Sequence, residues 1–306
     1  MATATPTIDL GVTFGIPALA GKQFPAKGLT DPGVPEIISN YVFRLPLLRK
    51  ALIWMDGKAG RSIYLAGPSG SGKTSLAEQM AARLGWICTT LSCNVRTERA
   101  DIVGYMGLEN GSTRFIPGPL VRAMRNGEMI VFDEGDALPP SITITLNRVL
   151  EGSPLVIPET GEVIHPHKDF RIAFTGNTRG RGDETGTHRA SNVQDAAVLD
   201  RFLFLEVGYP TQEEENDILV GKFGTALPDE IREILLKTAQ ESRAAFIGGE
   251  LSAPISTRGL VRISELVKSG IFSGTNEPLW EAMCFGFADG LTEGEKSGLR
   301  SIMKLG

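Results

Sequence analysis

The stretch GPSGSGKT, residues 67–74, fits the phosphate-loop pattern GxxxxGK[ST] at every position. An apolar run at 62–66 precedes it and a helical pattern at 74–85 follows it, which is the strand–loop–helix context that the pattern requires. Glycines let consecutive backbone N–H groups turn toward phosphate oxygens, and the start of the following helix adds a favourable dipole. The stretch therefore predicts a nucleotide-phosphate site at the end of a buried strand.

Each residue of this loop has an expected role. We expect Lys73 to reach the β and γ phosphates, and the Thr74 hydroxyl to ligate Mg²⁺. The other expected nucleotide contacts are Gly67, Pro68, Ser69, Gly70, Ser71, Gly72 and Ser75. A dinucleotide fingerprint is excluded, because a GxGxxG frame starting at Gly70 would need glycine where Ser75 stands. The loop binds phosphates and not the base, so the choice between ATP and GTP stays open at this point.

Two adjacent carboxylates, Asp133 and Glu134, end the apolar run EMIVFDE. We expect Asp133 to hold the magnesium, directly or through its water, and Glu134 to polarise a water for attack on the γ phosphate. A protein that only binds nucleotide would not need Glu134, so the pair favours hydrolysis. Asn177 ends another apolar run, FRIAFTGN, where it can orient the attacking water or sense the γ phosphate; an asparagine that caps a turn is the alternative.

Short apolar runs, each near the length of a buried strand, recur through the middle of the chain. They are residues 62–67, 86–93, 128–134, 170–177 and 201–210. Continuous apolar runs separated by helical or polar stretches predict a parallel sheet covered on both faces. Strands that alternate with helices form an α/β domain.

The two ends of the chain have a different character. Residues 1–42 are predicted to be an irregular N-terminal arm, and residues 36–60 short helical pieces that close at Gly57. The stretches after Pro210 carry helical spacing with acidic residues near their starts. We therefore predict an ATPase core at 43–209 and a small all-helical domain at 210–306.

Composition limits the class of protein. The chain of 306 residues has a formal net charge of -5, which does not suggest a nucleic-acid or membrane-surface binder. No apolar run reaches the roughly 18 residues needed to cross a bilayer, and the N-terminus lacks the features of a signal peptide. Three cysteines make a disulfide framework implausible, so we expect a cytoplasmic protein. Cys88 and Cys93 are expected to be buried thiols, and His165 and His167 to be structural.

These motifs in this order resemble an AAA+ ATPase, from about Phe43 to the end of the chain. The resemblance implies ATP with Mg²⁺, a five-stranded parallel sheet followed by a helical lid, and assembly as a homo-oligomeric ring of six. Two inserts resemble the MoxR-type branch of that family. They are a helix-2 insert at residues 101–127 and a hairpin around ETGE at 154–170, which precedes the Asn177 strand.

Shorter stretches are similar to the small ATPase subunit of aerobic cobaltochelatase. They are FGIPA, RADIVGYMGL, VFDEGDA, RVLE, IHPHKDFRIAFTGNT, GDETG and LDRF. This resemblance implies a protein partner that carries a von Willebrand factor A domain with a metal-dependent adhesion site. The chain has no DxSxS pattern, so such a site would have to come from another chain.

Two arginines take expected roles from the resemblance. Arg201 in LDRF matches the arginine finger that a ring subunit presents to its neighbour's ATP, and Arg258 in STRGL matches the sensor-2 position. Arg179, Arg181 and Arg189 crowd the loop after Asn177. They are expected to contact a neighbouring subunit, to compete with Arg201 for the finger role, to bind an anionic partner, or to lie in solvent.

Three functions remain open from the sequence. The first is a ring-forming ATPase that remodels a protein partner, with metal or cofactor insertion as one setting, and with Tyr105, Met106 and Phe115 of the helix-2 insert as its moving surface. The second is a nucleic-acid-dependent ATPase motor, which the acidic charge disfavours. The third is a nucleotide-gated scaffold, which Glu134 and Arg201 disfavour.

Overall fold

The computed structural model describes residues 6–109, 111–182 and 192–303. Contacts between residues divide the chain into two compact units. The first unit comprises Met1–Ile38, Leu45–Gly67 and Lys73–Val207, and the second comprises Ser39–Arg44, Pro68–Gly72 and Gly208–Gly306. The phosphate loop is thus shared between the units, and its middle belongs to the second. The domain limits at 42/43 and 209/210 remain a prediction.

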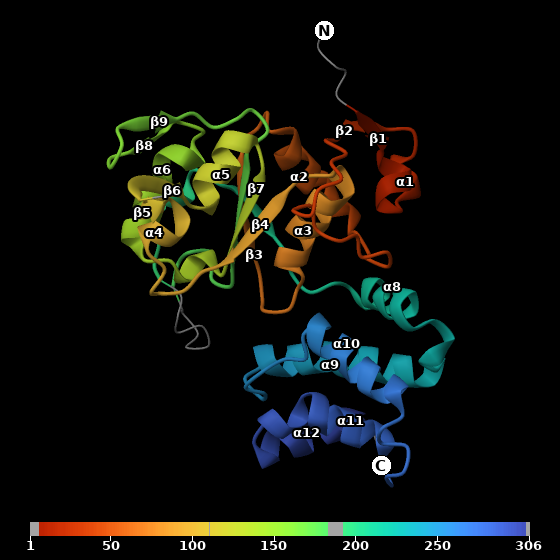
Figure 1. Ribbon diagram of the computed structural model, residues 1–306. Helices are drawn as coiled ribbons and strands as arrows, with labels where there is room; N and C mark the ends of the chain where they lie inside the picture. The colour runs from red at the N-terminus through yellow and green to blue at the C-terminus, as the bar shows by residue number, and fades with distance from the viewer. Residues whose placement is uncertain (1–5, 110, 183–191, 304–306) are drawn as a thin grey trace. The chain divides into compact units, whose positions relative to one another are not determined.

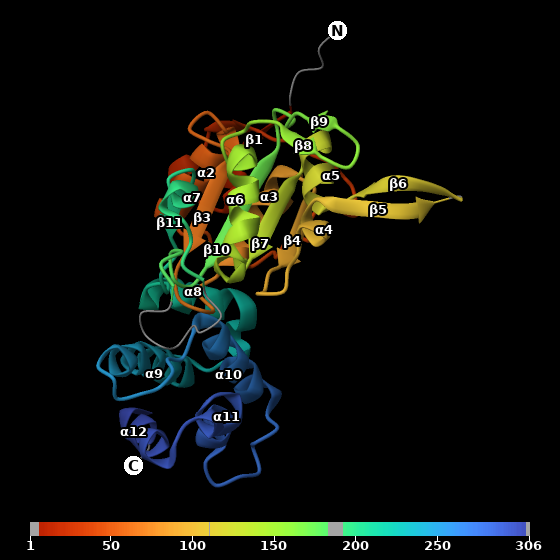
Figure 2. The same cartoon turned by 90° about the vertical axis from the view of Figure 1, so that its left-hand side faces the viewer.

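The first unit is built on a five-stranded parallel sheet of order β11-β3-β10-β7-β4 (Figures 1 and 2). Its strands are β3 (Ser62–Ala66), β4 (Cys88–Ser92), β7 (Met129–Asp133), β10 (Arg171–Gly176) and β11 (Leu203–Glu206). Each strand lies within one of the predicted apolar runs, so the predicted parallel sheet is confirmed. The three central strands are almost entirely buried because helices cover both faces, which explains their unbroken apolar sequences.

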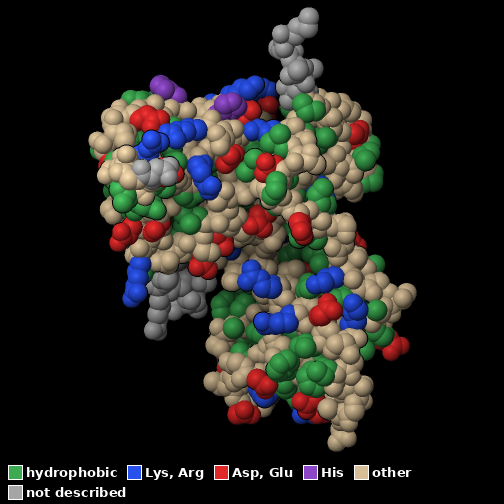
Figure 3. Space-filling model, in the orientation of Figure 1, with side chains coloured by type: hydrophobic (Ala, Val, Ile, Leu, Met, Phe, Trp, Pro, Cys, Tyr) green, Lys and Arg blue, Asp and Glu red, His purple; other side chains and the backbone are tan. Residues whose placement is uncertain are grey.

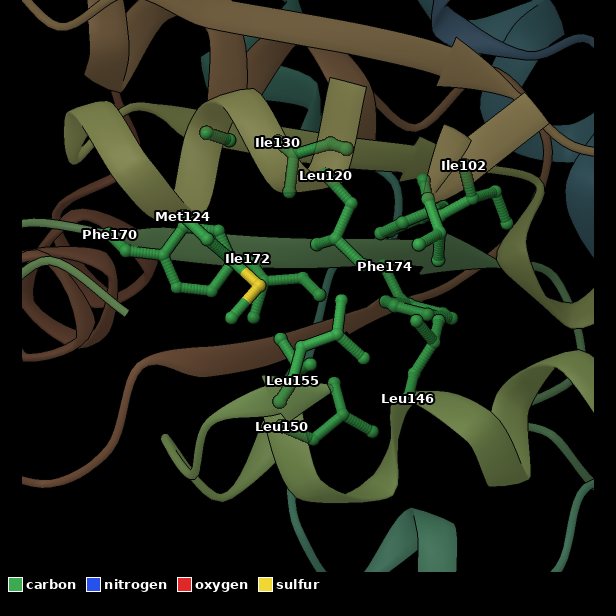
Figure 4. Close-up of a cluster of buried hydrophobic side chains, with 14 of the residues drawn as sticks. Ile102, Leu120, Met124, Ile130, Leu146, Leu150, Leu155, Phe170, Ile172 and Phe174 are labelled. Carbon is green, nitrogen blue, oxygen red and sulfur yellow. The ribbon is translucent and has the colours of Figure 1, made fainter. Parts of the chain in front are cut away.

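Helices on the two faces of the sheet complete the first unit's core. They are α2 (Leu45–Asp56), α3 (Lys73–Leu84), α4 (Arg99–Ile102), α5 (Pro119–Asn126), α6 (Pro140–Leu150) and α7 (Ala196–Leu199), with the 3₁₀ turn η2 (Gly135–Ala137). On one face, Leu120 and Met124 of α5 and Leu146 of α6 pack against Ile172 and Phe174 of β10 (Figure 4). Apolar side chains from elements that are far apart in the sequence therefore share one core.

Two hairpins interrupt the alternation of strands and helices. One pairs β5 (Gly104–Glu109) with β6 (Ser112–Pro117) between β4 and β7, and the other pairs β8 (Leu155–Ile157) with β9 (Glu162–Ile164) before β10. Both inserts predicted from the sequence are present at the predicted places.

The N-terminal segment differs from the irregular arm expected for residues 1–42. It forms β1 (Thr7–Asp9), α1 (Leu10–Phe14), the 3₁₀ turn η1 (Pro17–Leu19) and β2 (Gln23–Pro25). The two strands pair antiparallel, and Leu10, Phe14 and Leu19 are buried. The elements are too short to give a sequence period, which is why the pattern showed none. Residues 36–44 are not helical, contrary to expectation, and the helix closes before Gly57 as predicted.

The second unit contains the helices of the C-terminal third. They are α8 (Gln212–Phe223), α9 (Asp229–Ile247), α10 (Thr257–Ser269), α11 (Pro278–Gly286) and α12 (Glu293–Met303), with the 3₁₀ turns η3 (Gly224–Ala226) and η4 (Ala288–Gly290). A shared apolar cluster that includes Leu235, Ile263 and Met283 holds these helices together. The all-helical character predicted for this part of the chain is confirmed. No helix in the described part of the chain has the length and apolar content that a membrane span requires.

Candidate functional site

The carboxyl ends of neighbouring parallel strands bring the predicted site residues of the first unit together. Ala66 of β3 pairs with Gly176 of β10, and Phe174 of β10 pairs with Phe132 of β7. Gly67, Asp133 and Asn177 follow these residues directly, so they lie at the same edge of the sheet. Parallel α/β sheets bind ligands at this edge.

Asp133 sits at the centre of a hydroxyl cluster. Its Oδ1 accepts a hydrogen bond of 2.5 Å from the Thr74 hydroxyl and one of 2.7 Å from the Thr175 hydroxyl. Thr175 Oγ1 also accepts a bond of 3.0 Å from the backbone N–H of Glu134. Thr175 therefore fixes both residues of the acidic pair. Thr175 was not predicted from the sequence, although its place one residue before the end of a strand that terminates in the site was a usable signal.

The oxygen donors at this point suit a hard cation. Thr74 and Asp133 supply a hydroxyl and a carboxylate oxygen in direct contact, and Mg²⁺ prefers such oxygen ligands while it keeps several waters. The two residues expected to hold magnesium are thus adjacent. When bound, the ion would neutralise charge on the β and γ phosphate oxygens.

Lys73 links the loop to the strand that carries Asn177. Its Nζ donates to the Gly67 carbonyl at 2.8 Å and to Asn177 Oδ1 at 2.9 Å, and the residue is only 8% exposed. These contacts hold the ammonium group at the edge of the sheet where a phosphate chain is expected. They also place the Asn177 amide beside the Lys73 ammonium group, a contact that a turn-capping role alone would not require.

Asp136, a third acidic residue, positions Asn177. The residue is 2% exposed, and its Oδ2 accepts bonds from the backbone N–H of Asn177 (2.8 Å), from the Thr178 N–H (3.3 Å) and from the Thr178 hydroxyl (3.1 Å). A buried carboxylate needs such donors. No role for Asp136 was predicted from the sequence, although a charged residue in an otherwise apolar turn was an available signal.

Glu134 has a strained backbone. Its φ of 57° lies in the left-handed region, which costs a non-glycine residue roughly 1–2 kcal/mol. The side chain is exposed, whereas Asp133 beside it is half-buried. The turn thus separates two adjacent carboxylates, one held by hydroxyls and one open to a water molecule.

Arg201 is held by a carboxylate of its own unit. Its Nε lies 2.6 Å from Glu151 Oε1, its Nη1 donates to the Ala197 carbonyl, and a quarter of the side chain is exposed. The structure therefore places Arg201 at the surface but in an intramolecular ion pair. A finger role would require this pair to exchange for a phosphate.

The other arginines differ in their contacts. Arg179 has a φ of 55° and its Nη2 lies 2.6 Å from Glu206 Oε1. Arg181 is exposed and forms an isolated β-bridge with Val193, while Arg189 lies outside the described residues. Arg258 belongs to the second unit, in the first turn of α10, and its exposed side chain makes no hydrogen bond or ion pair with another described residue.

The second unit holds the middle of the phosphate loop against α10. A Cβ added to Gly70, whose φ is +72°, would lie 2.6 Å from the hydroxyl oxygen of Ser256, the N-cap of α10. Only glycine fits this backbone conformation and this contact. The Ser71 side chain is buried in the same unit.

The side chains of Cys88, Cys93, His165 and His167 form none of the hydrogen bonds described above. Cys93 is buried, and burial together with the carboxylates of Asp133, Glu134 and Asp136 raises the pKa of its thiol to about 12. Cys88 is half-buried, and burial raises the pKa of its thiol to about 12 as well. The half-buried Cys88 thus differs from the fully buried thiol expected. His167 packs against Gly127, and His165 is exposed.

Two family models match the chain. Residues 62–202 match the AAA domain of the dynein-related subfamily, and residues 215–300 match the CbbQ/NirQ/NorQ C-terminal domain. Together they cover four of the five strands of the sheet, both hairpins and most of the C-terminal helices.

Individual proteins resemble the chain over most of its length. The aerobic cobaltochelatase subunit CobS of Sinorhizobium sp is 33% identical over 269 residues, which cover 85% of this chain and 80% of that protein. The protein CbbQ of Hydrogenophilus thermoluteolus is 30% identical over 68% of this chain and 75% of its own length. Among solved structures, a Thermotoga maritima RuvB mutant shares the fold with a TM-score of 0.55 at 16% identity, covering 81% of this chain and 72% of that one.

Proposed function

The chain belongs to the AAA+ ATPases of the MoxR-like branch, together with CobS and CbbQ, and we propose that it uses ATP hydrolysis to remodel a protein partner. As a member of that family it binds ATP with Mg²⁺ and hydrolyses it. The motifs at the edge of the sheet are those that phosphoryl transfer to water requires. The proposal concerns the process that ATP hydrolysis drives, which is the remodelling of a protein partner.

The exposed apolar side chains of the β5–β6 hairpin are the main support for the remodelling of a protein partner. Tyr105 is 54% exposed, Met106 41% and Leu108 80%, on strands that extend away from the sheet of the first unit (Figure 2). Exposed apolar side chains grouped on one projecting element favour contact with another protein. Phe115, which we also expected in this surface, is half-buried against the core of the first unit and supports the hairpin instead.

The base of this hairpin is tied to the catalytic strand. The Gly118 N–H donates to the Val103 carbonyl, and a Cβ on Gly118 would lie 2.4 Å from the Ile102 carbonyl oxygen, so the two strands leave the core at a tight junction. Helix α5 starts immediately after this junction and packs on β7, which ends in Asp133. A shift of β7 on ATP binding or hydrolysis would therefore reach Tyr105 and Leu108 through a short rigid path.

The β8–β9 hairpin adds a second exposed surface in the same unit. Val156 and Val163 pair across its strands and are 51% and 49% exposed. Ion pairs Arg99–Glu159 and Arg125–Glu162, both at 2.7 Å, fasten its turn and second strand to the helices on either side of the first hairpin. Both hairpins would then move together.

The assembly that we propose is a homo-oligomeric ring of six. In it Arg201 acts as the arginine finger on the ATP of a neighbouring subunit, Asn177 as sensor and Arg258 as the sensor-2 arginine. The supporting observation is that the Arg201 side chain is 25% exposed and that Glu151, itself 47% exposed, is its only carboxylate contact among the described residues.

The partner that we propose carries a von Willebrand factor A domain, and the setting is metal or cofactor insertion in the cytoplasm. The likeness to a cobaltochelatase subunit supports this choice. The charge distribution disfavours a nucleic-acid motor, because on the face shown in Figure 3 Lys and Arg side chains lie among Asp and Glu side chains rather than in a basic stripe.

The test is a pull-down of Glu134→Gln protein with ATP from the cells that make it, read by mass spectrometry. This variant should bind ATP without hydrolysing it and hold its client. Recovery of a von Willebrand A-domain protein, lost in a Glu134→Gln/Leu108→Ser double variant, is the expected result. A Glu134→Gln/Lys73→Ala variant, which should bind no ATP, is the control. Recovery of DNA-processing proteins through a nuclease-sensitive association would overturn the proposal in favour of a nucleic-acid motor.

A further inference from the structure

Tyr209 bonds to the phosphate loop from a distant point in the sequence. Within the second unit, its hydroxyl donates a hydrogen bond of 3.0 Å to the carbonyl oxygen of Ser69. A loop that turns its N–H groups toward a phosphate leaves its carbonyl oxygens to be satisfied by other donors. Tyr209 supplies one such donor, and Arg44 of the same unit makes a longer contact, 3.5 Å, with the Ser71 carbonyl.

The ring of Tyr209 is itself held in place. The Arg243 guanidinium carbon lies 4.3 Å from the ring centroid, at cation–π distance. Burial raises the pKa of the Tyr209 phenol, so the hydroxyl stays protonated and remains a donor at neutral pH. The position of the ring therefore depends on what holds Arg243.

Arg243 is fixed by a buried carboxylate. Its two Nη atoms lie 3.0 and 2.6 Å from the two oxygens of Glu215, and its Nε donates to the Ile255 carbonyl at 2.9 Å. Glu215 is 1% exposed. A two-pronged pair of this kind, with the Nε–H also bonded, holds one geometry.

The same carboxylate reaches the first turn of α10. The Thr257 hydroxyl donates to Glu215 Oε1 at 2.7 Å, and Thr257 directly precedes Arg258. Ser256, one residue earlier, is the side chain that Gly70 approaches so closely. Glu215 thus connects α8, α9 and the start of α10. Through these elements it supports two residues of the phosphate loop, Ser69 by way of Tyr209 and Gly70 by way of Ser256.

We propose that Tyr209 is a positioning residue for ATP, held by the Arg243–Glu215 pair, and that its hydroxyl keeps Ser69 in the loop shape that accepts phosphates. The inference concerns ATP binding by the chain alone. It requires the ATPase activity but not the remodelling of a partner, so either can fail without the other.

The direct test is Tyr209→Phe, which removes the hydroxyl and keeps the ring over Arg243. Loss of one hydrogen bond to the loop weakens ground-state and transition-state binding alike, so the Kd and KM for ATP should rise about 5- to 10-fold while kcat stays within about two-fold. Kd is measured with a fluorescent ATP analogue, and KM and kcat by phosphate release without any client. Ser301→Ala removes an exposed hydroxyl from α12 of the same unit and should alter neither constant.

A second variant tests the support of the ring. Arg243→Lys keeps the charge but loses the fork, and it should raise KM by a similar factor. The KM for ATP of the double variant Tyr209→Phe/Arg243→Lys should then be no higher than that of the more affected single variant, because both changes break one chain of contacts. Additive losses, or a folded Tyr209→Phe protein with an unchanged Kd for ATP, would overturn the inference. A fall in kcat at constant KM would overturn it as well.

Discussion

The side chains of Lys73 and Asp133 are held by hydrogen bonds to groups of the first unit, whereas the Arg258 side chain makes no hydrogen bond or ion pair with another described residue. Two of the described arginines with expected or competing finger roles, Arg201 and Arg179, each form an ion pair with a glutamate at the surface. The edge of the sheet therefore holds its site residues by hydrogen bonds within the unit, whereas the arginines have surface ion pairs or no side-chain partner among the described residues.

The difference follows from the free energy of each contact. Half-buried bonds around a carboxylate are expensive to leave unmade, while an exposed ion pair is worth only about 0–1 kcal/mol. The edge of the sheet is thus organised before a ligand arrives, and the arginines stay free to exchange partners. We expect substitutions at the edge to act within one chain and substitutions of the arginines to act between chains.

The largest effect is expected from Lys73→Ala. Loss of a charged donor to two phosphates should weaken ATP binding on the order of 100-fold or more. Isothermal titration calorimetry measures this, with Lys58→Ala as the control because that ammonium is on the surface and 86% exposed. An affinity within about three-fold of the unmodified chain would place Lys73 outside the site.

Arg201→Ala is expected to separate binding from turnover. ATP affinity should stay within about three-fold, while turnover falls on the order of 100-fold, because the finger acts on transition-state charge. Mixing this variant with Lys73→Ala should restore part of the activity if the arginine acts on a neighbour. Arg179→Ala is the matched comparison: loss and rescue there, but not at Arg201, would move the finger to Arg179.

Asp136→Asn should lower turnover about 10-fold and also lower the melting temperature. The substitution leaves the size unchanged but weakens bonds that hold Asn177 and Thr178, at a cost of about 1–3 kcal/mol. Asp195→Asn, at the exposed N-cap of α7, provides the control. If stability falls while turnover is unchanged, Asp136 supports the fold but does not position Asn177.

Glu151→Gln should have a small effect in the opposite direction. Weakening the pair that holds Arg201 frees the guanidinium, so turnover should rise by no more than about three-fold at low salt. Glu206→Gln makes the same change beside Arg179 and should leave turnover as it is. A loss of turnover in Glu151→Gln comparable to that of Arg201→Ala would mean that the pair is part of the active arrangement.

The smallest effect is expected on the pKa of the Cys93 thiol, which depends on the negative charges at the edge of the sheet. Its raised pKa, about 12, keeps the thiol neutral below about pH 11, and a ¹³Cβ chemical shift should show this directly. In Glu134→Gln one of the negative charges that raise this pKa is removed, so the pKa should fall. An unchanged titration would show that the charge of Glu134 does not contribute to the raised pKa.

Much of this arrangement could be predicted from local sequence. The five strands, both hairpins, the phosphate loop and the acidic pair each follow from a short pattern with a physical reason. Thr175 and Asp136 could not be assigned in this way, because their partners Asp133 and Asn177 lie about forty residues away along the chain. The N-terminal strands could not be predicted for another reason, since elements of three residues are too short to show a sequence period.

The sequence by itself determined the nucleotide chemistry, because GPSGSGKT and the Asp133–Glu134 pair specify phosphate and magnesium ligands within a few residues of chain. Only the tertiary structure decided which groups hold those ligands in place: Thr175 on Asp133, Asp136 on Asn177, Tyr209 on Ser69, and Glu151 on Arg201. Ligand atoms are a property of residue type and spacing. Their support is a property of proximity, which burial of the core creates between segments that the sequence keeps apart.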